Sequence, residues 1–199
     1  MKKRIAKGAR KTTETRIKWE LNLDGKGQGK VKTGIPFLDH MLTLFAKHGL
    51  FDLKMEAKGD LEVDIHHTNE DIGLGLGEAV KKALGDKKGI RRFAAAFVPM
   101  DEALARVVID ISGRPSLKFI RKNSLSQVKA EEGYNLKDAE HFLKSFSNES
   151  GINVHVEMEY GDDLHHVLEA VFKAFSRALG EATQIDPRVK GVPSTKGRL

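Results

Sequence analysis

Two stretches of the sequence repeat a set of side chains that could bind metal ions. In each stretch two adjacent histidines precede a glutamate, and the two sets are His66, His67 and Glu70, and His165, His166 and Glu169. If each stretch begins a helix, the first histidine and the glutamate lie one turn apart on one face, while the second histidine points about 100° away around the axis. One helix start could then give two ligands to one metal ion and a third ligand to another.

A further histidine precedes each pair. His40 lies 26 residues before His66, and His141 lies 24 residues before His165, so six of the eight histidines follow one register. A single His-His pair near a helix start is usually a cap or a solvated feature. Because the whole set recurs in the same order, we favour metal binding. Manganese, zinc, iron and nickel all accept imidazole and carboxylate ligands, and ligand type alone does not choose among them.

Composition restricts the class of protein. A chain of 199 residues, 40% of them hydrophobic, can bury a core as one domain or as two fused half-domains of about 95 residues. Cysteine is absent, which excludes disulfides and thiolate ligands. No apolar run approaches the roughly 18 residues that cross a membrane, and no apolar segment follows the basic start as in a signal peptide. We therefore expect a cytoplasmic protein without a membrane partner.

The net charge of +6 raises the possibility of a nucleic-acid partner. Lys and Arg are interspersed with Asp and Glu, however, and aromatic residues make up only 7% of the chain. A small anionic substrate explains a few well-placed cations better than a polyanion does. We expect no nucleic-acid partner.

The first half of the chain predicts two strands, a helix, further strands and a second helix. The first ten residues are basic and expected to be mobile. An alternating pattern from residue 13 to residue 23 predicts a half-buried strand, and a turn at 24–29 leads into a short second strand, which predicts a hairpin. Glu14 lies on the opposite face of this strand, where a solvated carboxylate is the ordinary expectation.

Two helices in this half carry the candidate ligands. Pro36 begins a helix that Gly49 ends, with His40 inside it and His48 near its C-terminus, where an imidazole could cap the dipole. Strand patterns follow at 51–57 and 61–65, and a helix is predicted over 68–84. This helix contains three glycines, each costing about 1 kcal/mol relative to alanine, so we expect close packing against another helix or a bound group.

The second half repeats this plan. Strands are predicted at 103–111 and 117–121, a helix at 136–146, a strand at 152–158 and a helix at 165–179 with His165, Glu169 and Lys173 on one face. Two copies of hairpin, helix, strand and helix predict an α+β fold with pseudo-twofold symmetry, with repeats at about 12–92 and 93–183. The tail, 184–199, ends in a small, hydroxyl-rich, cationic loop of the kind that wraps phosphate oxygens; a disordered basic C-terminus is the alternative.

Six motifs of this sequence occur together in one known family. They are Phe37–Met41, His66–Asp71, Pro99–Ala103, Ser112–Pro115, His165–Ala170 and Pro193–Gly197. Together they resemble imidazoleglycerol-phosphate dehydratase, the manganese enzyme of histidine biosynthesis. The resemblance runs from about residue 12 to residue 199, and since no phosphatase domain is fused to it, we expect the monofunctional form, a single domain over 1–199.

The resemblance implies a reaction and an assembly. The family eliminates water from D-erythro-imidazole glycerol phosphate to give imidazole acetol phosphate. The carbon that loses the proton has no carbonyl beside it, so the charge needs another sink, which an imidazolate ring bridged between two metal ions supplies. The implied fold is a tandem pair of βαβ-type half-domains, ribosomal protein S5 domain 2-like, with sheets packed against helices. Subunits form trimers and then, with metal, a 24-subunit shell with sites between subunits.

The resemblance also implies roles for individual residues. Each active site would hold two Mn(II) ions, each bound by three imidazoles and one carboxylate. The helix geometry suggests a grouping as a hypothesis: His66, Glu70, His141 and His166 at one ion, and His40, His67, His165 and Glu169 at the other. Glu14 matches the family's N-terminal glutamate and is expected to be the general base. The expected substrate contacts are Glu14, His40, His48, His67, Asp71, Arg92, Arg114, Lys173, Ser194 and Lys196, with Arg91 a surface charge.

Two other classes of protein remain as alternatives. A dinuclear metallohydrolase also uses histidine and carboxylate clusters, although it normally has bridging carboxylates and fewer histidines per metal. A metal-storage protein would explain the ligands but not Glu14 or the cationic tail. Hydrolysis of a generic phosphoester would favour the first, and tight metal binding without turnover the second.

Overall fold

Each half of the chain folds into a four-stranded sheet with two helices. The computed structural model describes residues 3–122 and 133–199. The first half contains β1 (Ile5–Lys11), β2 (Arg16–Asn22), β3 (Gly29–Lys32), α1 (Pro36–Gly49), β4 (Asp52–Lys58) and α2 (His66–Leu84). The second half contains β5 (Phe93–Met100), β6 (Ala103–Asp110), β7 (Ser116–Arg121), α3 (Leu136–Ser150), β8 (Asn153–Tyr160) and α4 (Leu164–Thr183). The order of strands and helices is the same in both halves.

The two sheets share one topology. Their strand orders are β1-β2-β4-β3 and β5-β6-β8-β7, so each sheet is a mixed one. In each, the last pair, β3 with β4 and β7 with β8, is parallel, and the other neighbours are antiparallel. The predicted α+β fold of two pseudo-symmetric half-domains is confirmed.

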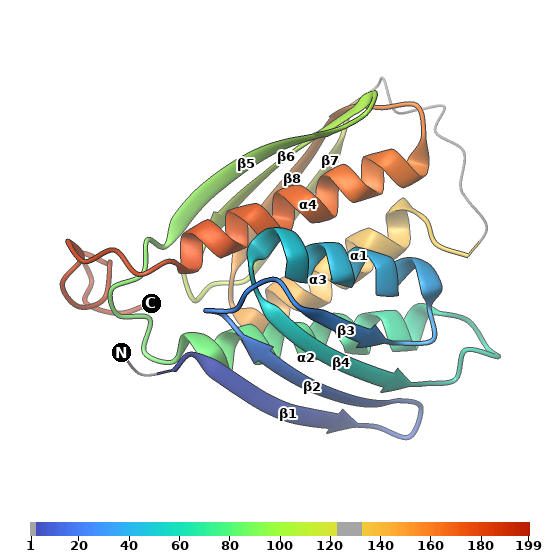
Figure 1. The fold of residues 1–199 in the computed structure, drawn as a ribbon, viewed down its shortest axis with the longest axis horizontal. Helices are drawn as coiled ribbons and strands as arrows, with labels where there is room; N and C mark the ends of the chain where they lie inside the picture. The colour runs from blue at the N-terminus through green and yellow to red at the C-terminus, as the bar shows by residue number, and fades with distance from the viewer. Residues whose placement is uncertain (1–2, 123–132) are drawn as a thin grey trace.

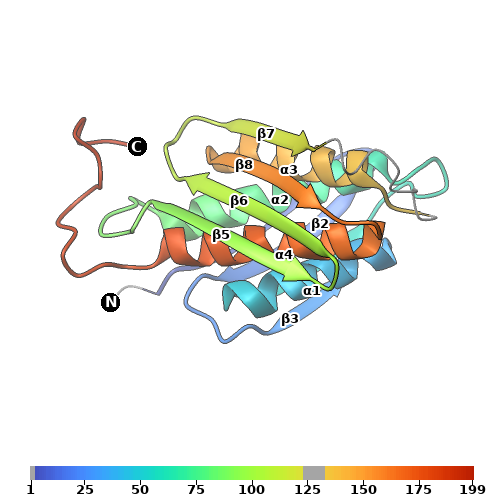
Figure 2. The same cartoon turned by 90° about the horizontal axis from the view of Figure 1, so that it is seen from above.

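The four helices lie between the two sheets (Figure 1). α1 and α2 pack on the first sheet and α3 and α4 on the second, while across the middle α2 packs against α3 and α1 against α4. The buried faces of the strands supply apolar side chains to this interior, among them Ile17, Trp19 and Leu21 of β2. Figure 2, seen from above, shows the second sheet covering the helices and both chain termini at one end.

The predicted close packing around the glycines of α2 is confirmed. A Cβ atom at Gly73 would lie 2.5 Å from the carbonyl oxygen of Phe142, and one at Gly77 would lie 2.7 Å from that of Phe146. Both carbonyls belong to α3, so only glycine lets the two helix backbones approach this closely. The consequence for function is that the starts of α2 and α3 lie next to one another.

The prediction of a mobile N-terminus was wrong over residues 5–10; residues 1 and 2 lie outside the described part. Residues 5–11 form β1, which pairs antiparallel with β2, so the hairpin joins β1 to β2. β3, the predicted hairpin partner, instead pairs parallel with β4. The inner face of β1 is made of small residues: Ala6 is buried, and Gly8 lies against the Trp19 ring. Such a face carries little apolar periodicity.

Three further differences concern loops, a helix start and a sheet edge. Residues 61–65 form a turn instead of a strand, and α2 begins at His66, two residues earlier than predicted. The strand β5 was not predicted, since its two phenylalanines, Phe93 and Phe97, are exposed and alanines separate them. Residues 186–199 form turns without a helix or strand. Among the described residues no helix has the length and apolar character that a membrane span requires.

Candidate metal centre

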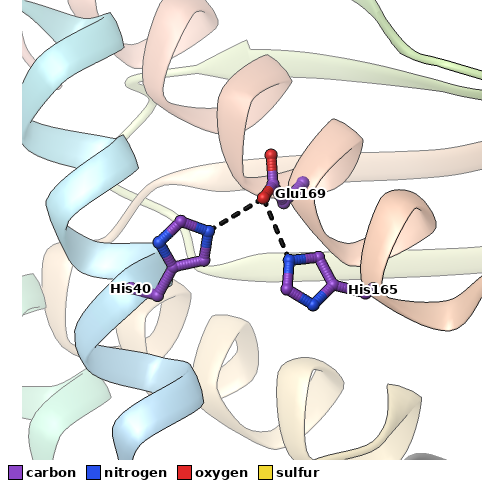
Figure 3. A group of neighbouring side chains, drawn as sticks. All are labelled: His40, His165 and Glu169. Carbon is purple, nitrogen blue, oxygen red and sulfur yellow. Dashed lines mark hydrogen bonds and ion pairs between the residues drawn. The ribbon is translucent and has the colours of Figure 1, made fainter.

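Two imidazoles and a carboxylate meet where α1 packs against α4. His40 Nε2 lies 2.8 Å from Glu169 Oε1, and His165 Nε2 lies 3.0 Å from the same oxygen (Figure 3). His165 and Glu169 are four residues apart on α4 and share one face, as the sequence predicted. Lys173, one turn further, places Nζ 2.5 Å from Glu169 Oε2. We call His40, His165 and Glu169 the α1–α4 cluster.

The carboxylate of the α1–α4 cluster is ionised at neutral pH. Burial of Glu169 by itself would raise the pKa of this group, but hydrogen bonds from Lys173, His40 and His165 outweigh burial and lower the pKa to about 2. The Glu169 carboxylate is therefore already deprotonated when a metal ion binds.

The metal-free protein is expected to lose stability as pH falls from about 4.5 to about 2. The ordinary pKa of a glutamate is 4.5, and that of folded Glu169 is about 2. A lowered pKa means that Glu169 contributes stability above the unfolded value, and that this contribution disappears as pH falls through the folded value. Melting temperatures of wild type and Glu169→Gln across this window check the expectation. Equal slopes in the two proteins would contradict it.

A second cluster forms where α2 packs against α3. His66 Nδ1 lies 3.2 Å from His141 Nδ1, and His66 Nε2 lies 3.4 Å from Glu70 Oε1. Asp64 fixes the start of α2, because its Oδ1 accepts a hydrogen bond from the His66 backbone N–H at 2.7 Å. We call His66, Glu70 and His141 the α2–α3 cluster. The pseudo-symmetry that exchanges the two halves relates this cluster to the first, since α1 corresponds to α3 and α2 to α4.

Two hydrogen bonds and two ring contacts run from α2 and α3 to His165 of the α1–α4 cluster. Tyr134 donates from its hydroxyl to Asn69 Oδ1 at 3.0 Å, and Asn69 Nδ2 donates to the Asp138 carbonyl at 2.8 Å, which joins α2 to α3. The Tyr134 ring stacks on Phe37 at 5.3 Å, and the Phe37 ring meets His165 edge-on at 5.2 Å. Burial raises the pKa of Tyr134 well above its ordinary value, so its hydroxyl stays protonated and able to donate.

Replacing Tyr134 with phenylalanine is expected to lower the free energy of unfolding by about 1–3 kcal/mol, because Asn69 Oδ1 would lose its donor. Asn69 is fully buried, so water cannot replace the lost bond. Urea unfolding of the metal-free protein measures the change. Tyr160→Phe is the matched control, since the Tyr160 side chain is exposed, and it should leave stability unchanged. Equal effects of the two variants would contradict the role of this hydrogen bond.

The second histidine of each pair lies apart from both clusters. His67 Nδ1 lies 2.9 Å from Asp60 Oδ2 and 3.7 Å from Glu14 Oε2, and His166 Nδ1 lies 2.7 Å from Glu102 Oε2. The hydrogen bond to Asp60, followed by the charge of Glu14, raises the pKa of His67. The hydrogen bond to Glu102 raises the pKa of His166, and His166 in turn lowers the pKa of Glu102 to about 2.

The structure thus brings together three members of each predicted four-ligand group. The α2–α3 cluster lacks His166 and the α1–α4 cluster lacks His67. The predicted grouping assigns each second histidine to the other site, and within one chain each of them faces a carboxylate of its own surroundings instead. Glu14, Asp60 and His67 form a third group whose ligand atoms lie within 4.8 Å of one another.

Glu14 lies on the turn that joins β1 to β2. Thr12 Oγ1 accepts hydrogen bonds from the backbone N–H groups of Glu14, at 3.2 Å, and Thr15, at 2.9 Å. Asp71 anchors this turn from α2: its carboxylate accepts hydrogen bonds from Thr15 Oγ1 and, at 2.7 Å, from Arg10 Nε. Both oxygens of Asp71, a predicted substrate contact, are therefore occupied within the chain, and the residue lies beneath the Glu14 turn.

The predicted phosphate contacts of the tail lie far from the clusters. Arg92 pairs with Asp110 at 2.7 Å, donates from Nη1 to the Pro193 carbonyl at 2.8 Å, and through its backbone N–H reaches the Ala182 carbonyl at 2.9 Å. Ala182 is near the end of α4, a helix of 20 residues and so about 30 Å long, whereas His165 is at its start. Within one chain, Arg92 and the tail are thus at the opposite end of the helix layer from His165.

The remaining predicted contacts divide between the two ends. Arg114 belongs with the tail, because the adjacent Gly113 lies against Leu199, and Ser194 and Lys196 share a turn in which the Lys196 N–H donates to Ser194 Oγ. Lys173 lies at the α1–α4 cluster, where it pairs with Glu169. His48 is close enough to Lys173 to feel its charge: desolvation, followed by the charges of Lys173 and Arg177, lowers the pKa of His48.

Arg91, predicted to be a surface charge, pairs with Glu181.

The residues that hold the candidate ligands in place were assigned no role in the sequence analysis. The supporting residues Asp60, Glu102, Asn69 and Tyr134 were not singled out. A readable signal existed only for the start of α3, where Asn135 and Asp138 form a capping box.

The donor sets fit divalent first-row metal ions. Each cluster offers imidazole nitrogens and one carboxylate, the ligands that manganese, iron, zinc and nickel accept, and the chain has no cysteine that would favour a softer ion. Each carboxylate lies within 4.8 Å of the imidazole nitrogens of its cluster, so one ion could contact all three groups. The residues present therefore suit a metal centre.

Comparisons with known proteins agree with this description. The family model of imidazoleglycerol-phosphate dehydratase (IGPD) matches residues 33–179. The dehydratase of Geobacillus kaustophilus is 57% identical over 191 residues, 96% of each chain, and that of Bacillus subtilis is 54% identical over 196 residues, 98% of this chain and all of the other.

Solved structures show the same similarity. That of the Staphylococcus aureus dehydratase has a TM-score of 0.78 at 37% identity and covers 92% of this chain and 99% of its own. That of IGPD from Pyrococcus furiosus has a TM-score of 0.81 at 36% identity and covers 96% of this chain and all of its own. The chain therefore belongs to the imidazoleglycerol-phosphate dehydratase family, a family of hydro-lyases.

Proposed function

We propose that this chain converts D-erythro-imidazole glycerol phosphate into imidazole acetol phosphate and water in histidine biosynthesis, using two Mn(II) ions per active site in a cytoplasmic assembly. The observation that carries the proposal is the pair of pseudo-symmetric clusters, each with two imidazoles and one carboxylate. Two such clusters related by the internal repeat are what a dinuclear site requires. Manganese itself comes from the family resemblance, since the donor set accepts several metals.

Each cluster needs one more imidazole to reach three, and the second histidines supply it. His166 would complete the α2–α3 cluster of a neighbouring subunit, and His67 would complete the α1–α4 cluster. In one chain these rings face their own carboxylates instead of the clusters. When bound, the two ions would stabilise negative charge on the substrate's imidazole ring.

Glu14 is proposed to take the proton from carbon. Glu14 lies on a turn that hydrogen bonds involving Thr12, Thr15 and Asp71 stabilise. Its carboxylate faces His67, so the proposed base lies beside a proposed metal ligand. The electron pair of the C–H bond forms a C=C bond as the bond from the neighbouring carbon to its hydroxyl breaks. The departing hydroxide takes the proton back from Glu14 and leaves as water, and the resulting enol tautomerises to the ketone. Positioning the base in this way reduces the orientational cost of proton transfer.

The phosphate group is proposed to bind the cationic tail of a different subunit. Arg92, Arg114, Ser194 and Lys196 offer guanidinium, hydroxyl and ammonium donors for phosphate oxygens. Because they lie about one helix length from the clusters of their own chain, a single pocket needs at least two chains. Homo-oligomers built from trimers, up to the 24-subunit shell that the resemblance implies, satisfy this condition. Lys173, His40 and His48 contact the substrate from the metal side.

A comparison of two substrates tests the proposed function. Metal-loaded protein should release imidazole acetol phosphate from imidazole glycerol phosphate and should release no phosphate from p-nitrophenyl phosphate. Phosphate release from the second compound without dehydration of the first would favour a metallohydrolase. Tight binding of Mn(II) with turnover of neither would favour metal storage.

A further inference from the structure

The second histidine of each pair is held by a carboxylate of its own chain through the same ring atom. His67 Nδ1 lies 2.9 Å from Asp60 Oδ2, and His166 Nδ1 lies 2.7 Å from Glu102 Oε2. The two carboxylates come from different places in the repeat, because Asp60 is in the loop before α2 and Glu102 is in the turn between β5 and β6. The same contact has therefore been built twice from unrelated positions.

The other ring nitrogen, Nε2, makes no hydrogen bond in either histidine within the part of the chain that the structure describes. His67 Nε2 has no ion-pair partner there either, whereas His166 Nε2 lies 3.8 Å from Asp101 Oδ2, on a side chain that is 71% exposed. The side chains of His67 and His166 are 41% and 30% exposed. Each ring thus has one nitrogen fixed inside the chain and the other available to a neighbouring molecule.

Both carboxylates are fixed in turn. Glu102 Oε1 accepts hydrogen bonds from the backbone N–H groups of Asp163, at 3.0 Å, and Asp162, at 3.3 Å, and Asp163 caps α4 by accepting the His166 N–H. The Asp60 side chain is only 18% exposed, and its Oδ1 is buried without a partner in the described part of the chain. A buried oxygen without a partner is costly, so the contact with His67 is the evident benefit of this placement.

We propose that Asp60 and Glu102 are positioning residues of the metal centre, each holding the proton of its histidine on Nδ1 so that Nε2 presents a lone pair to a metal ion. The inference rests on the proposed function, in which His67 and His166 are ligands. A neutral imidazole carries one proton, and the carboxylate decides which nitrogen keeps it. It also fixes the plane of the ring before the neighbouring subunit arrives.

A third metal site at Glu14, Asp60 and His67 is the competing explanation of the same geometry. The ring atom that faces both carboxylates is Nδ1, and the hydrogen bond to Asp60 already uses it. The two explanations differ in the number of ions bound. If Asp60 only positions His67, the chain binds two ions. If Glu14, Asp60 and His67 form a metal site themselves, the chain binds a third ion.

The test measures Mn(II) affinity of the full-length, metal-stripped protein by competition with a chelator. Asp60→Asn and Glu102→Gln keep the size of each side chain but remove its charge, and an amide N–H can donate to Nδ1 and move the proton to Nε2. Each variant should lower the affinity for one of the two Mn(II) ions by about 10- to 100-fold. Glu62→Gln, on the same loop as Asp60, and Asp162→Asn, on the β8–α4 loop that contacts Glu102 through its backbone, are the matched controls. Both side chains are exposed, and the affinities of both variants should equal that of wild type.

Ligand variants separate failure of this inference from failure of the proposed function. If His67→Ala and His166→Ala leave both Mn(II) affinities unchanged, the proposed ligand set itself is wrong. If those variants lose affinity while Asp60→Asn and Glu102→Gln do not, the ligands stand and the positioning role is overturned. Asp60→Asn should add no further loss to His67→Ala, since the carboxylate acts only through that ring. A third ion that Asp60→Asn removes would also overturn the inference.

Discussion

Replacing Glu14 with glutamine is expected to lower kcat by about 100- to 10,000-fold, the usual contribution of a general base. The variant keeps the size of the side chain and the backbone hydrogen bond to Thr12 that holds the turn. It removes only the ability to accept the proton from carbon. Steady-state turnover of imidazole glycerol phosphate, measured with both metal sites filled, gives kcat and KM separately.

The control for this variant is a carboxylate of the same surface region. Glu62 lines the same hollow as Glu14 and is exposed, and Glu62→Gln should be fully active. Mn(II) binding by Glu14→Gln should match wild type, because Glu14 is not among the proposed ligands. Full activity in Glu14→Gln would assign the proton transfer to another residue, and loss of metal from it would make Glu14 a ligand instead.

Removing a ligand from either cluster is expected to empty one site and leave the other filled. His66→Ala and Glu70→Gln should each lose the ion of the α2–α3 cluster, and His165→Ala and Glu169→Gln should each lose that of the α1–α4 cluster. Loss of one ion removes several kcal/mol of charge stabilisation from the transition state, which corresponds to about a 1,000-fold fall in kcat. Metal analysis of each purified variant gives the number of ions bound per chain.

His155→Ala is the matched control for these ligand variants. This histidine is exposed on β8 and belongs to neither cluster, so its removal should leave two ions per chain and full activity. The grouping would be wrong if His66→Ala and Glu70→Gln emptied different sites. A protein with two substitutions in one cluster should lose no more metal than a protein with either substitution alone.

Helical periodicity was enough to predict which candidate ligands of one helix share a face. His165 and Glu169 share a face because they are four residues apart on a helix, and the glycines of α2 correctly indicated a close helix neighbour. The grouping of His40 with Glu169 and of His66 with His141 was predicted from the internal repeat and the family resemblance, and in the structure each pair lies close together. The spacing of side chains along one helix depends only on neighbouring residues, which is why it could be predicted from the sequence.

The parts that failed depend on pairing over longer distances. β1 has a face of small residues that packs against Trp19, so its buried side shows no apolar pattern, while the apolar alternation at 61–65 belongs to a turn. The position of Arg92 relative to the clusters follows from the length of α4 and the path of the tail. Asp60 and Glu102 carry no local signal, since exposed carboxylates in loops are common and only their contact with a histidine distinguishes them.

The most direct test of the dinuclear dehydratase is a titration of Mn(II) into metal-stripped protein, with release of imidazole acetol phosphate recorded at each addition. The two clusters predict no turnover without metal and a rate that rises until two ions are bound per chain. Full turnover by the metal-free protein, or a maximal rate with one ion per chain, would contradict a site built from both clusters.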